Sequence, residues 1–441
     1  MRMMGSIKPS SRAETSRLMY DLAEELFPYC RSITGDGLRK TLLRIQKELP
    51  ELIVHAVPSG TACFDWVVPD EWNISSATLT APDGTVVADF QSSNLHVVNY
   101  SVPVDMMLSL TDLQSHLYSI PEQSDAIPYV TTYFDRQWGF CLTERVRKSL
   151  KDGIYHAKIE STLSPGELNY GELFIPGRSP EEILISVNVC HPSMANNELS
   201  GPVLATYLAK ALVQRDKRRF SYRFVFVPET IGAIAFISAN INTLREKVIA
   251  GFVLTCIGDD RCYSYLASRK GDTYTDRVAK HVLQHIDPNF ITYSYLDRGS
   301  DERQYCAPGV DLPVVVLTRS KFRTYPEYHT SLDDMGFISP KALGDSLAMV
   351  EACIDAIEDD EIFRATMLCE VQLGRRGLYK EIRDRTYKGD PRLRMDILAY
   401  CDGENSLLDI ADLLDRPISD IVRCANELRE HGLLETAQAP D

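Results

Sequence analysis

Four short and almost unbroken apolar runs in the middle of the chain constrain its fold more than any other feature. They are ILISVNV (183–189), RFVFV (223–227), GFVLTCI (251–257) and PVVVLT (313–318), and helix-like stretches lie between them. Continuous hydrophobicity of this length is typical of strands that are covered on both faces. The alternation predicts an α/β domain with a largely parallel sheet, helices on both faces, and its chemistry at the carboxyl ends of the strands.

The rest of the chain differs in texture and predicts three further segments. Residues 1–50 are expected to form N-terminal helices of the α/β domain, because apolar residues recur there at helical spacing. Residues 51–145 contain short β-prone runs broken by proline and glycine turns, which predicts a small, mostly β module inserted into the domain. The α/β domain then occupies 146–375. Residues 376–441 predict a winged-helix-like domain, in which Ser406 and Asp409 resemble a capping box.

The charge balance excludes some classes of partner. The net charge of −15 disfavours non-specific binding to nucleic acid or to an anionic membrane. The winged-helix segment from Pro391 to Glu435 carries five arginines against ten acidic residues, the opposite of what a DNA reader needs. We therefore expect this segment to pack on the enzyme, to oligomerise or to dock a protein. No apolar run reaches the roughly 18 residues of a membrane span, and residues 1–12 lack the apolar stretch of a secretory signal, so we expect a cytoplasmic protein.

Polar side chains of metal-binding type follow two of the predicted strands. His191 comes directly after ILISVNVC, and Glu198 follows seven residues later at the start of a helix. Imidazole and carboxylate are ligands that zinc takes, although a hydrogen-bonded loop histidine is the simpler alternative. His329 lies after PVVVLT, with Tyr328 before it and Asp333 after it; Asp333 or a backbone carbonyl could orient its second ring nitrogen. The eleven cysteines, Cys190 among them, are interpreted as buried small apolar residues.

Two acidic groups could act beside such a metal. Glu229, in FVFVPETIGA (224–233), ends another strand and could serve as a general base, or only as a helix cap or surface carboxylate. Asp301, Glu302 and Arg303 form a dense charged cluster before the strand PVVVLT. The cluster indicates either a solvated loop or a substrate-binding loop.

Taken together, these segments resemble the zinc exopeptidases of the M28 type, which have a phosphorylase/hydrolase-like fold. The closer resemblance is to a bacterial subgroup of aminopeptidase-like proteins (DUF4910/DUF2172) with an inserted β module and a C-terminal winged helix. It spans nearly the whole chain and rests on FPYCRSITGDG (27–37), FDWVVPDEWN (64–73), SNLHVVNYS (93–101), CHPSMANNELSGP (190–202), FVPETIG (226–232), GSDERQY (299–305) and EYHTSLD (327–333).

The chain departs from the metal set that this resemblance implies. Asn197 stands where the exopeptidases have an aspartate that bridges two metals, Thr230 where they have a glutamate ligand, and Thr255 near a further aspartate ligand. Two adjacent cations need anionic ligands, so the resemblance implies one zinc, held by His191, His329 and Glu198. Glu229 matches the general base of the family.

The resemblance also suggests how a substrate is held. Asp301 and Glu302 would bind a substrate ammonium, and Arg303 a carboxylate or phosphate, with Asn197 and Tyr328 beside them. The alternating pattern around His96 favours a core or turn role, but His96 and Tyr100 could also line the cleft, as could Arg31 and Ser32.

Three functions are compatible with these patterns. The first is hydrolysis of an amide or peptide bond in a small molecule or short peptide, by a metal-activated water and Glu229. The second is acyl transfer or deacylation in glycan or secondary-metabolite synthesis. The third is a non-catalytic binding or regulatory role on a peptidase scaffold, which the three lost carboxylates permit and Glu229 disfavours. A homo-oligomer is compatible with each.

Overall fold

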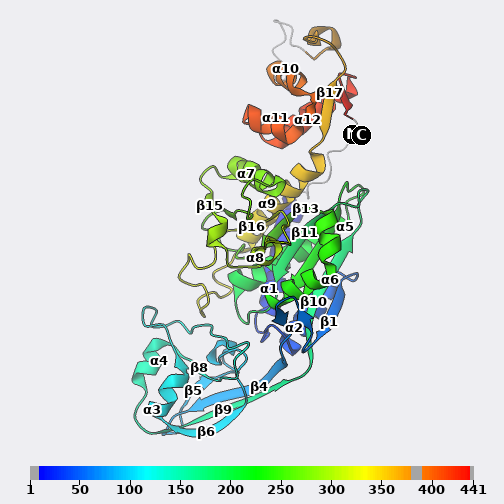
Figure 1. Cartoon of the computed structure of the whole chain (residues 1–441). Helices are drawn as coiled ribbons and strands as arrows, with labels where there is room; N and C mark the ends of the chain where they lie inside the picture. The colour runs from blue at the N-terminus through cyan, green and yellow to red at the C-terminus, as the bar shows by residue number, and fades with distance from the viewer. Residues whose placement is uncertain (1–8, 379–389, 438–441) are drawn as a thin grey trace. The chain divides into compact units, whose positions relative to one another are not determined.

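A computed structural model of the chain, which describes residues 9–378 and 390–437, contains one large eight-stranded sheet (Figure 1). Its central strands are parallel to one another: β12 (Ser221–Val227), β11 (Glu182–Asn188), β13 (Val248–Leu254) and β16 (Val314–Thr318), in that spatial order. They coincide with the four apolar runs and are almost completely buried. The predicted α/β sheet is therefore confirmed.

The edges of the sheet are not parallel. On one side β10 (Glu167–Ile175) runs antiparallel to β12, and β1 (Ile53–Pro58) runs antiparallel to β10. On the other side β14 (Ser264–Leu266) is antiparallel to β16 and pairs in parallel with β15 (Ile291–Tyr293). The sheet is mixed because these edge strands do not follow the strand–helix–strand pattern that the sequence made visible.

Helices cover both faces of the sheet. Leu184, Val225 and Val253 share an apolar cluster with residues of α6 (Ile231–Lys247). Neighbouring strand residues point to the opposite face, where β11 contacts α5 (Ser200–Val213). The helix α5 also contacts α1 (Pro9–Leu26) and α2 (Asp36–Glu48), whereas α6 contacts α8 (Glu302–Tyr305).

The inserted module has a four-stranded antiparallel sheet of its own. Its order is β5 (Val86–Asp89), β4 (Glu71–Thr80), β9 (Ile154–Ser164) and β6 (Val104–Ser109). The expected module limits of 51 and 145 do not match the sheets, because β1 pairs in the large sheet and β9 pairs in the small one. The remaining short elements are β2 (Ala62–Cys63), β3 (Trp66–Val67), α3 (Leu110–Leu113), β7 (Leu117–Tyr118), β8 (Phe140–Cys141) and α4 (Glu144–Ser149).

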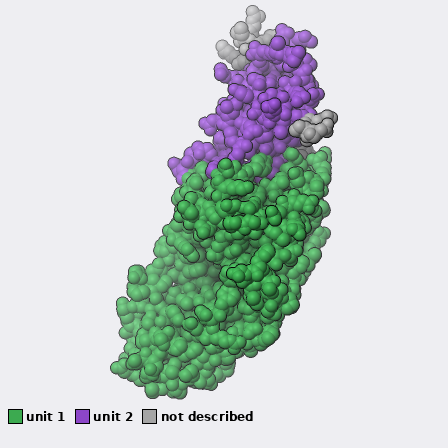
Figure 2. All heavy atoms as spheres, in the orientation of Figure 1, with its two compact units in different colours: residues 1–276, 290–348 green, residues 277–289, 349–441 purple. Residues whose placement is uncertain are grey.

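The chain divides into two compact units (Figure 2). Unit 1 comprises 1–276 and 290–348. Unit 2 comprises 277–289 and 349–441, and so includes most of α7 (Tyr274–Ile286) and the second half of α9 (Pro340–Asp359). No helix among the described residues is long and apolar enough to cross a membrane.

Unit 2 contains the expected winged-helix elements. These are α10 (Pro391–Tyr400), α11 (Leu407–Leu414) and α12 (Ile418–Glu430), with a sheet of β17 (Ile362–Ala365), β18 (Asp402–Ser406) and β19 (Leu434–Thr436). The capping box of Ser406 and Asp409 is present at the start of α11. The expected boundary at 376 lies too late in the chain, because β17 lies before it and yet pairs with β18 and β19 of the winged helix.

Candidate metal centre

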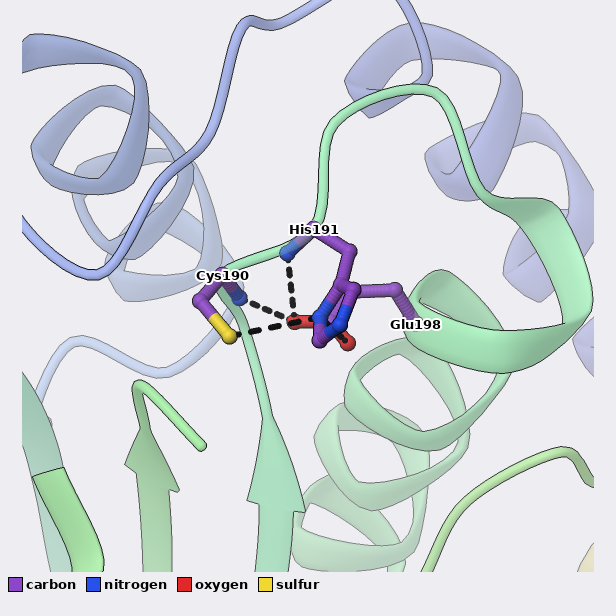
Figure 3. Close-up of side chains that lie close together, drawn as sticks. All are labelled: Cys190, His191 and Glu198. Atoms are coloured by element: carbon purple, nitrogen blue, oxygen red, sulfur yellow. Dashed lines mark hydrogen bonds and ion pairs between the residues drawn. The ribbon is translucent and has the colours of Figure 1, made fainter. Parts of the chain in front are cut away.

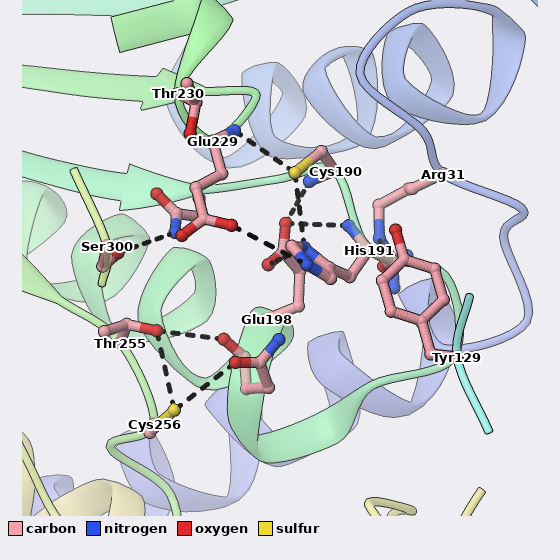
Figure 4. Close-up of polar contacts among 12 residues, drawn as sticks. Arg31, Tyr129, Cys190, His191, Glu198, Glu229, Thr230, Thr255, Cys256 and Ser300 are labelled. Carbon is pink, nitrogen blue, oxygen red and sulfur yellow. Dashed lines mark hydrogen bonds and ion pairs between the residues drawn. The ribbon is translucent and has the colours of Figure 1, made fainter. Parts of the chain in front are cut away.

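The carboxyl ends of three neighbouring parallel strands bring the candidate residues to one edge of the large sheet. His191 follows β11, Glu229 follows β12, and Thr255 directly follows β13. Because β11 lies between β12 and β13, the loop that carries His191 is central at this edge. Figure 4 shows Glu229 and Cys190 beside His191, with Thr255 next to Cys256.

His191 and Glu198 contact each other within the loop that joins β11 to α5 (Figure 3). Glu198 Oε1 accepts the backbone N–H of His191 at 2.9 Å and also that of Cys190. Glu198 Oε2 lies 2.9 Å from His191 Nδ1 without hydrogen-bond geometry, so it is a buried oxygen with no hydrogen bond. Burial disfavours the charged form of both groups. The attraction between their opposite charges outweighs burial, so the pKa of His191 is raised and that of Glu198 is lowered.

Cys190 adds a sulfur atom that the sequence analysis did not identify as a donor. Its Sγ lies 3.3 Å from His191 Nδ1 and accepts the backbone N–H of Glu229 at 3.2 Å. One donor atom each of Cys190, His191 and Glu198 lie within 4.8 Å of one another. Cys190 is buried, as expected from the sequence. The only sequence feature that indicated a role as a metal donor was its position before His191 at the end of a strand.

His329 lies beside His191, with ring centroids 5.0 Å apart. Its Nε2 is buried and has no hydrogen-bond partner among the described residues. Burial and the positive charges of His191 and Arg323 lower its pKa to about 2, so the ring is neutral and can act as a ligand. Its backbone has φ +56°, and Tyr328 stacks on the ring at 3.9 Å.

Asp333 does not orient His329, contrary to the expectation from the sequence. Its two carboxylate oxygens accept the backbone N–H groups of Asn196 at 2.6 Å and Asn197 at 2.9 Å. These donors lie in the first turn of η3 (Ala195–Leu199), a π-helical turn before α5 that has no capping side chain of its own. Asp333 therefore fixes the loop that carries Glu198, because free backbone donors in a buried turn need acceptors.

The donor set fits a zinc ion. The site offers two imidazoles, one carboxylate and one thiol. These are ligand types that zinc takes, the imidazoles in their neutral form. His329 Nε2 and Glu198 Oε2 are buried polar atoms without hydrogen bonds, which a bound cation would satisfy.

The Glu229 carboxylate lies close to His191. Its Oε2 lies 3.8 Å from His191 Nε2. Burial raises the pKa of Glu229, against the opposing charges of His191 and Arg303. A carboxylate with a raised pKa close to a ligand-type histidine is the arrangement that general base catalysis needs.

Asn197, which stands where the zinc exopeptidases have an aspartate, contacts a hydroxyl and a thiol. Its backbone carbonyl accepts the Thr255 hydroxyl at 3.0 Å, and its Oδ1 accepts the Cys256 thiol at 3.5 Å. These contacts between neutral groups join η3, which carries Asn197, to the residues that follow β13.

Asp301 and Glu302 of the charged cluster are buried near Glu229 rather than solvated, and Arg303 is half-buried. Asp301 Oδ1 accepts the N–H of Thr230 at 2.7 Å, and its buried Oδ2 has no hydrogen-bond partner among the described residues. Glu302 Oε1 accepts two backbone N–H groups of its own loop. Arg303 donates to the Thr230 hydroxyl, and its buried Nε has no hydrogen-bond partner in the part of the chain that the structure describes. Asp301 thus stabilises Thr230, whose φ is +67°.

The four other candidates from the N-terminal half lie in different places. Arg31 is fully buried at the centre: its Nε donates to the backbone carbonyl of His191 at 2.9 Å, and burial lowers its pKa to about 10 while Glu198 opposes this. His96 contacts the Cys141 carbonyl at 2.8 Å and shows no contact with His191 or Glu229 in the described structure. Ser32 bonds Asn99, and Tyr100 bonds the Asp70 carbonyl.

Comparisons with known proteins agree with this architecture. Residues 20–360 match the family described as Domain of unknown function (DUF4910), and residues 361–436 match a winged helix-turn-helix family. A relative from Clostridium acetobutylicum is 43% identical over 401 residues, covering 90% of this chain and 92% of its own. Its provisional name is polysaccharide biosynthesis protein with aminopeptidase-like domain.

Solved structures extend the comparison to zinc aminopeptidases. A crystal structure from Clostridium acetobutylicum, provisionally named a peptidase, has a TM-score of 0.91 at 41% identity and covers 97% of this chain and 98% of its own. The zinc aminopeptidase of Bacillus subtilis has a TM-score of 0.58 at 14% identity, over 81% of this chain and 96% of its own. The second likeness shows a common fold.

Proposed function

Because this chain belongs to the DUF4910 family and has an aminopeptidase-like fold, we propose that it is a metal-dependent hydrolase of an amide or peptide bond. The bond would belong to a small molecule or a short peptide. The observation that carries the proposal is the position of Glu229, whose carboxylate lies 3.8 Å from His191 Nε2. A protein that only binds a ligand has no use for a buried base at this position.

His191, His329 and Glu198 would hold the metal, which we propose to be one zinc ion, with the Cys190 sulfur as a further donor. When bound, zinc lowers the pKa of water to about 7 and polarises a carbonyl group. Glu229 would take the proton of the attacking water, and its raised pKa favours later transfer of that proton to the leaving amine. Arg31 holds the backbone of His191 in place during these steps.

The buried acidic cluster gives a basis for amine recognition. Asp301 Oδ2 has no hydrogen-bond partner in the described structure and lies next to the segment that carries Glu229. We propose that Asp301 binds a substrate ammonium and that the neighbouring Glu302 adds negative charge. Arg303 would bind a carboxylate or phosphate through its unpaired Nε, and Asn197 and Tyr328 would line the same space.

A second candidate is deacylation of an amide in glycan synthesis. The provisional name of the 43% identical relative, a polysaccharide biosynthesis protein, favours it. The same base and donors would serve, since an N-acyl sugar and a peptide present the same type of bond.

The test is turnover by the zinc-supplied full chain of two panels, aminoacyl p-nitroanilides and N-acetyl amino sugars. Glu229→Gln should reduce kcat on the accepted panel by about 10²-fold or more while the zinc content stays unchanged. Arg303→Gln should act mainly on KM. Turnover that survives Glu229→Gln would contradict the role of Glu229, and no turnover of either panel by the wild type would contradict the proposed function.

A further inference from the structure

A segment of the inserted module, residues 127–132, lies against the loop that carries His329. The N–H of Ser331 donates to the Ile127 carbonyl at 2.8 Å, and the Ser331 hydroxyl accepts the N–H of Ile127 at 3.0 Å. Two residues along the segment, the N–H of Tyr129 donates to the carbonyl of His329 itself at 2.8 Å. These hydrogen bonds attach the module to the His329 loop.

His329 needs such support because of its backbone conformation. Its φ is +56°, in the left-handed region that residues other than glycine rarely adopt. A residue in this region costs free energy and keeps its conformation only where its neighbours hold it. The Tyr129 N–H fixes the direction of the His329 carbonyl, and the Ser331 contacts fix the chain two residues later. The segment 127–132 therefore helps to set the direction in which the His329 ring points.

The same segment is attached to Asn99, a buried residue of the motif SNLHVVNYS. The N–H of Asn99 donates to the Val130 carbonyl at 2.8 Å, and its own carbonyl accepts the N–H of Thr132 at 3.0 Å. Its side chain contacts a different part of the chain. Asn99 Nδ2 donates to the Arg31 carbonyl at 3.2 Å, and Oδ1 accepts the Ser32 hydroxyl. Asn99 therefore joins the segment to the N-terminal turn that carries Arg31.

That turn holds the other histidine. Arg31 is fully buried, and its Nε donates to the backbone carbonyl of His191 at 2.9 Å. A continuous series of hydrogen bonds thus runs from the His191 carbonyl through Arg31 to Asn99. Through the module segment it continues to the His329 carbonyl. The ring of Tyr129, which belongs to this segment, packs 4.9 Å from the ring of His191 and 5.2 Å from that of His329.

We propose that Asn99 and Ser331 are positioning residues for the two histidine ligands, and that the inserted module thereby sets how tightly the centre binds zinc. This inference rests on the proposed function, since it takes both histidines as ligands. A metal ion needs its ligand atoms at fixed distances and angles, so groups that orient a ligand contribute to affinity. The motifs FPYCRSITGDG (27–37) and SNLHVVNYS (93–101) thus acquire a role, although neither supplies a proposed ligand.

The first experiment measures the zinc affinity of the full chain by competition with a chromophoric chelator. Asn99→Ala removes the side-chain contacts with Arg31 and Ser32. Ser331→Ala removes the acceptor of the Ile127 N–H. Each should weaken zinc binding by about tenfold or more, the effect of removing a group that orients a metal ligand. Ser331→Thr, which keeps the hydroxyl, should bind zinc as tightly as the wild type. Ser331 is half-buried, so Ser331→Ala decides the outcome if Asn99→Ala does not fold.

The control and a second readout separate positioning from general loss of stability. Tyr155→Phe is the matched control, because it removes a buried hydroxyl of the module that bonds the backbone of Lys151. It should leave the zinc affinity unchanged. Cobalt(II) in place of zinc gives the second readout, since its visible absorption reports the geometry of its ligands. The spectrum should change in Asn99→Ala and Ser331→Ala and stay the same in the control.

Turnover of the two substrate panels, measured on the same proteins, separates this inference from the proposed function. A zinc affinity that stays at the wild-type level in either Asn99→Ala or Ser331→Ala overturns the inference and leaves the hydrolase standing. An equal loss of affinity in Tyr155→Phe also overturns it, because general destabilisation would then explain the effect. Affinity that depends on Asn99 and Ser331 in a chain without turnover supports the inference and contradicts hydrolysis. A wild type that binds no zinc overturns both.

Discussion

At the scale of single residues, Glu198 and Arg31 carry opposite buried charges at the candidate metal centre. Glu198 accepts two backbone N–H groups and contacts the His191 ring, while Arg31 donates to the His191 carbonyl and is itself fully buried. Each charge lowers the cost of burying the other, so the loss of one leaves an uncompensated ion in the interior.

Glu198→Gln should therefore destabilise the metal-free protein by about 3–5 kcal/mol, because Arg31 stays charged and buried. Urea denaturation in the presence of a chelator measures this effect without a contribution from metal binding. Glu327→Gln is the matched control: Glu327 pairs with the exposed Arg261, and its loss should cost about 1 kcal/mol or less. Equal effects of the two substitutions would mean that Glu198 does not balance Arg31.

Residue types that carry chemistry by themselves were predictable, and residues that depend on their neighbours were not. His191, Glu229 and His329 could be identified as candidate site residues because each follows an apolar strand. Cys190 was interpreted as apolar, since a cysteine in an apolar run gives no sign of its contacts. Tyr129 belongs to the inserted module, and only folding brings its ring beside His191 and His329.

At the scale of elements, a buried histidine of α7 joins this helix to the last turn of α11 and to the N-terminus of α12. His281 Nδ1 lies 2.7 Å from Asp412, and its Nε2 accepts the N–H of Ile418 at 3.0 Å. Nε2 can accept only while the ring is neutral. Burial lowers the pKa of His281, while Asp412 opposes this, and His285 and Arg277 lower it further.

Unit 2 should therefore lose stability in mild acid. The folded pKa of His281 lies below its unfolded value of about 6.5, so its contribution is complete above that pH and declines as pH falls towards the folded pKa. Thermal unfolding followed at pH 7.5 and 5.5 checks this. His281→Gln, which can still accept from Ile418 and donate to Asp412, should show a smaller decline than the wild type; an equal decline would assign the effect to other groups.

The elements that the sequence predicted are those with a local signature. The four central strands are continuous apolar runs, and the start of α11 carries its own capping box. The edge strands β1, β10, β14 and β15 have no such signature, because their pairing is with partners distant in the chain. For the same reason β17 was assigned to the α/β domain, although it pairs with strands of the winged helix.

At the scale of the whole molecule, charge decides which partners the winged helix can have. The family match at 361–436 shows a fold that many DNA-binding proteins use. The net charge of −15, and ten acidic residues against five arginines between 391 and 435, oppose contact with phosphates.

We therefore expect no binding of the full chain to duplex DNA. Fluorescence anisotropy with a labelled random-sequence duplex at about 50 mM salt, where phosphate contacts are strongest, should show no change at micromolar protein. Binding that weakens steeply with added salt would contradict this expectation and would assign the domain to nucleic acid.

The most direct test of the account is the metal content of the purified full chain, measured by elemental analysis after zinc is supplied. The account predicts about one zinc per chain in the wild type and its loss in both His191→Ala and His329→Ala. His156→Ala, which alters an exposed histidine paired with Asp105 in the module, should keep the zinc. Two metals per chain would contradict the single site that Asn197, Thr230 and Thr255 imply, and a wild type that binds no metal would contradict the proposed hydrolase itself.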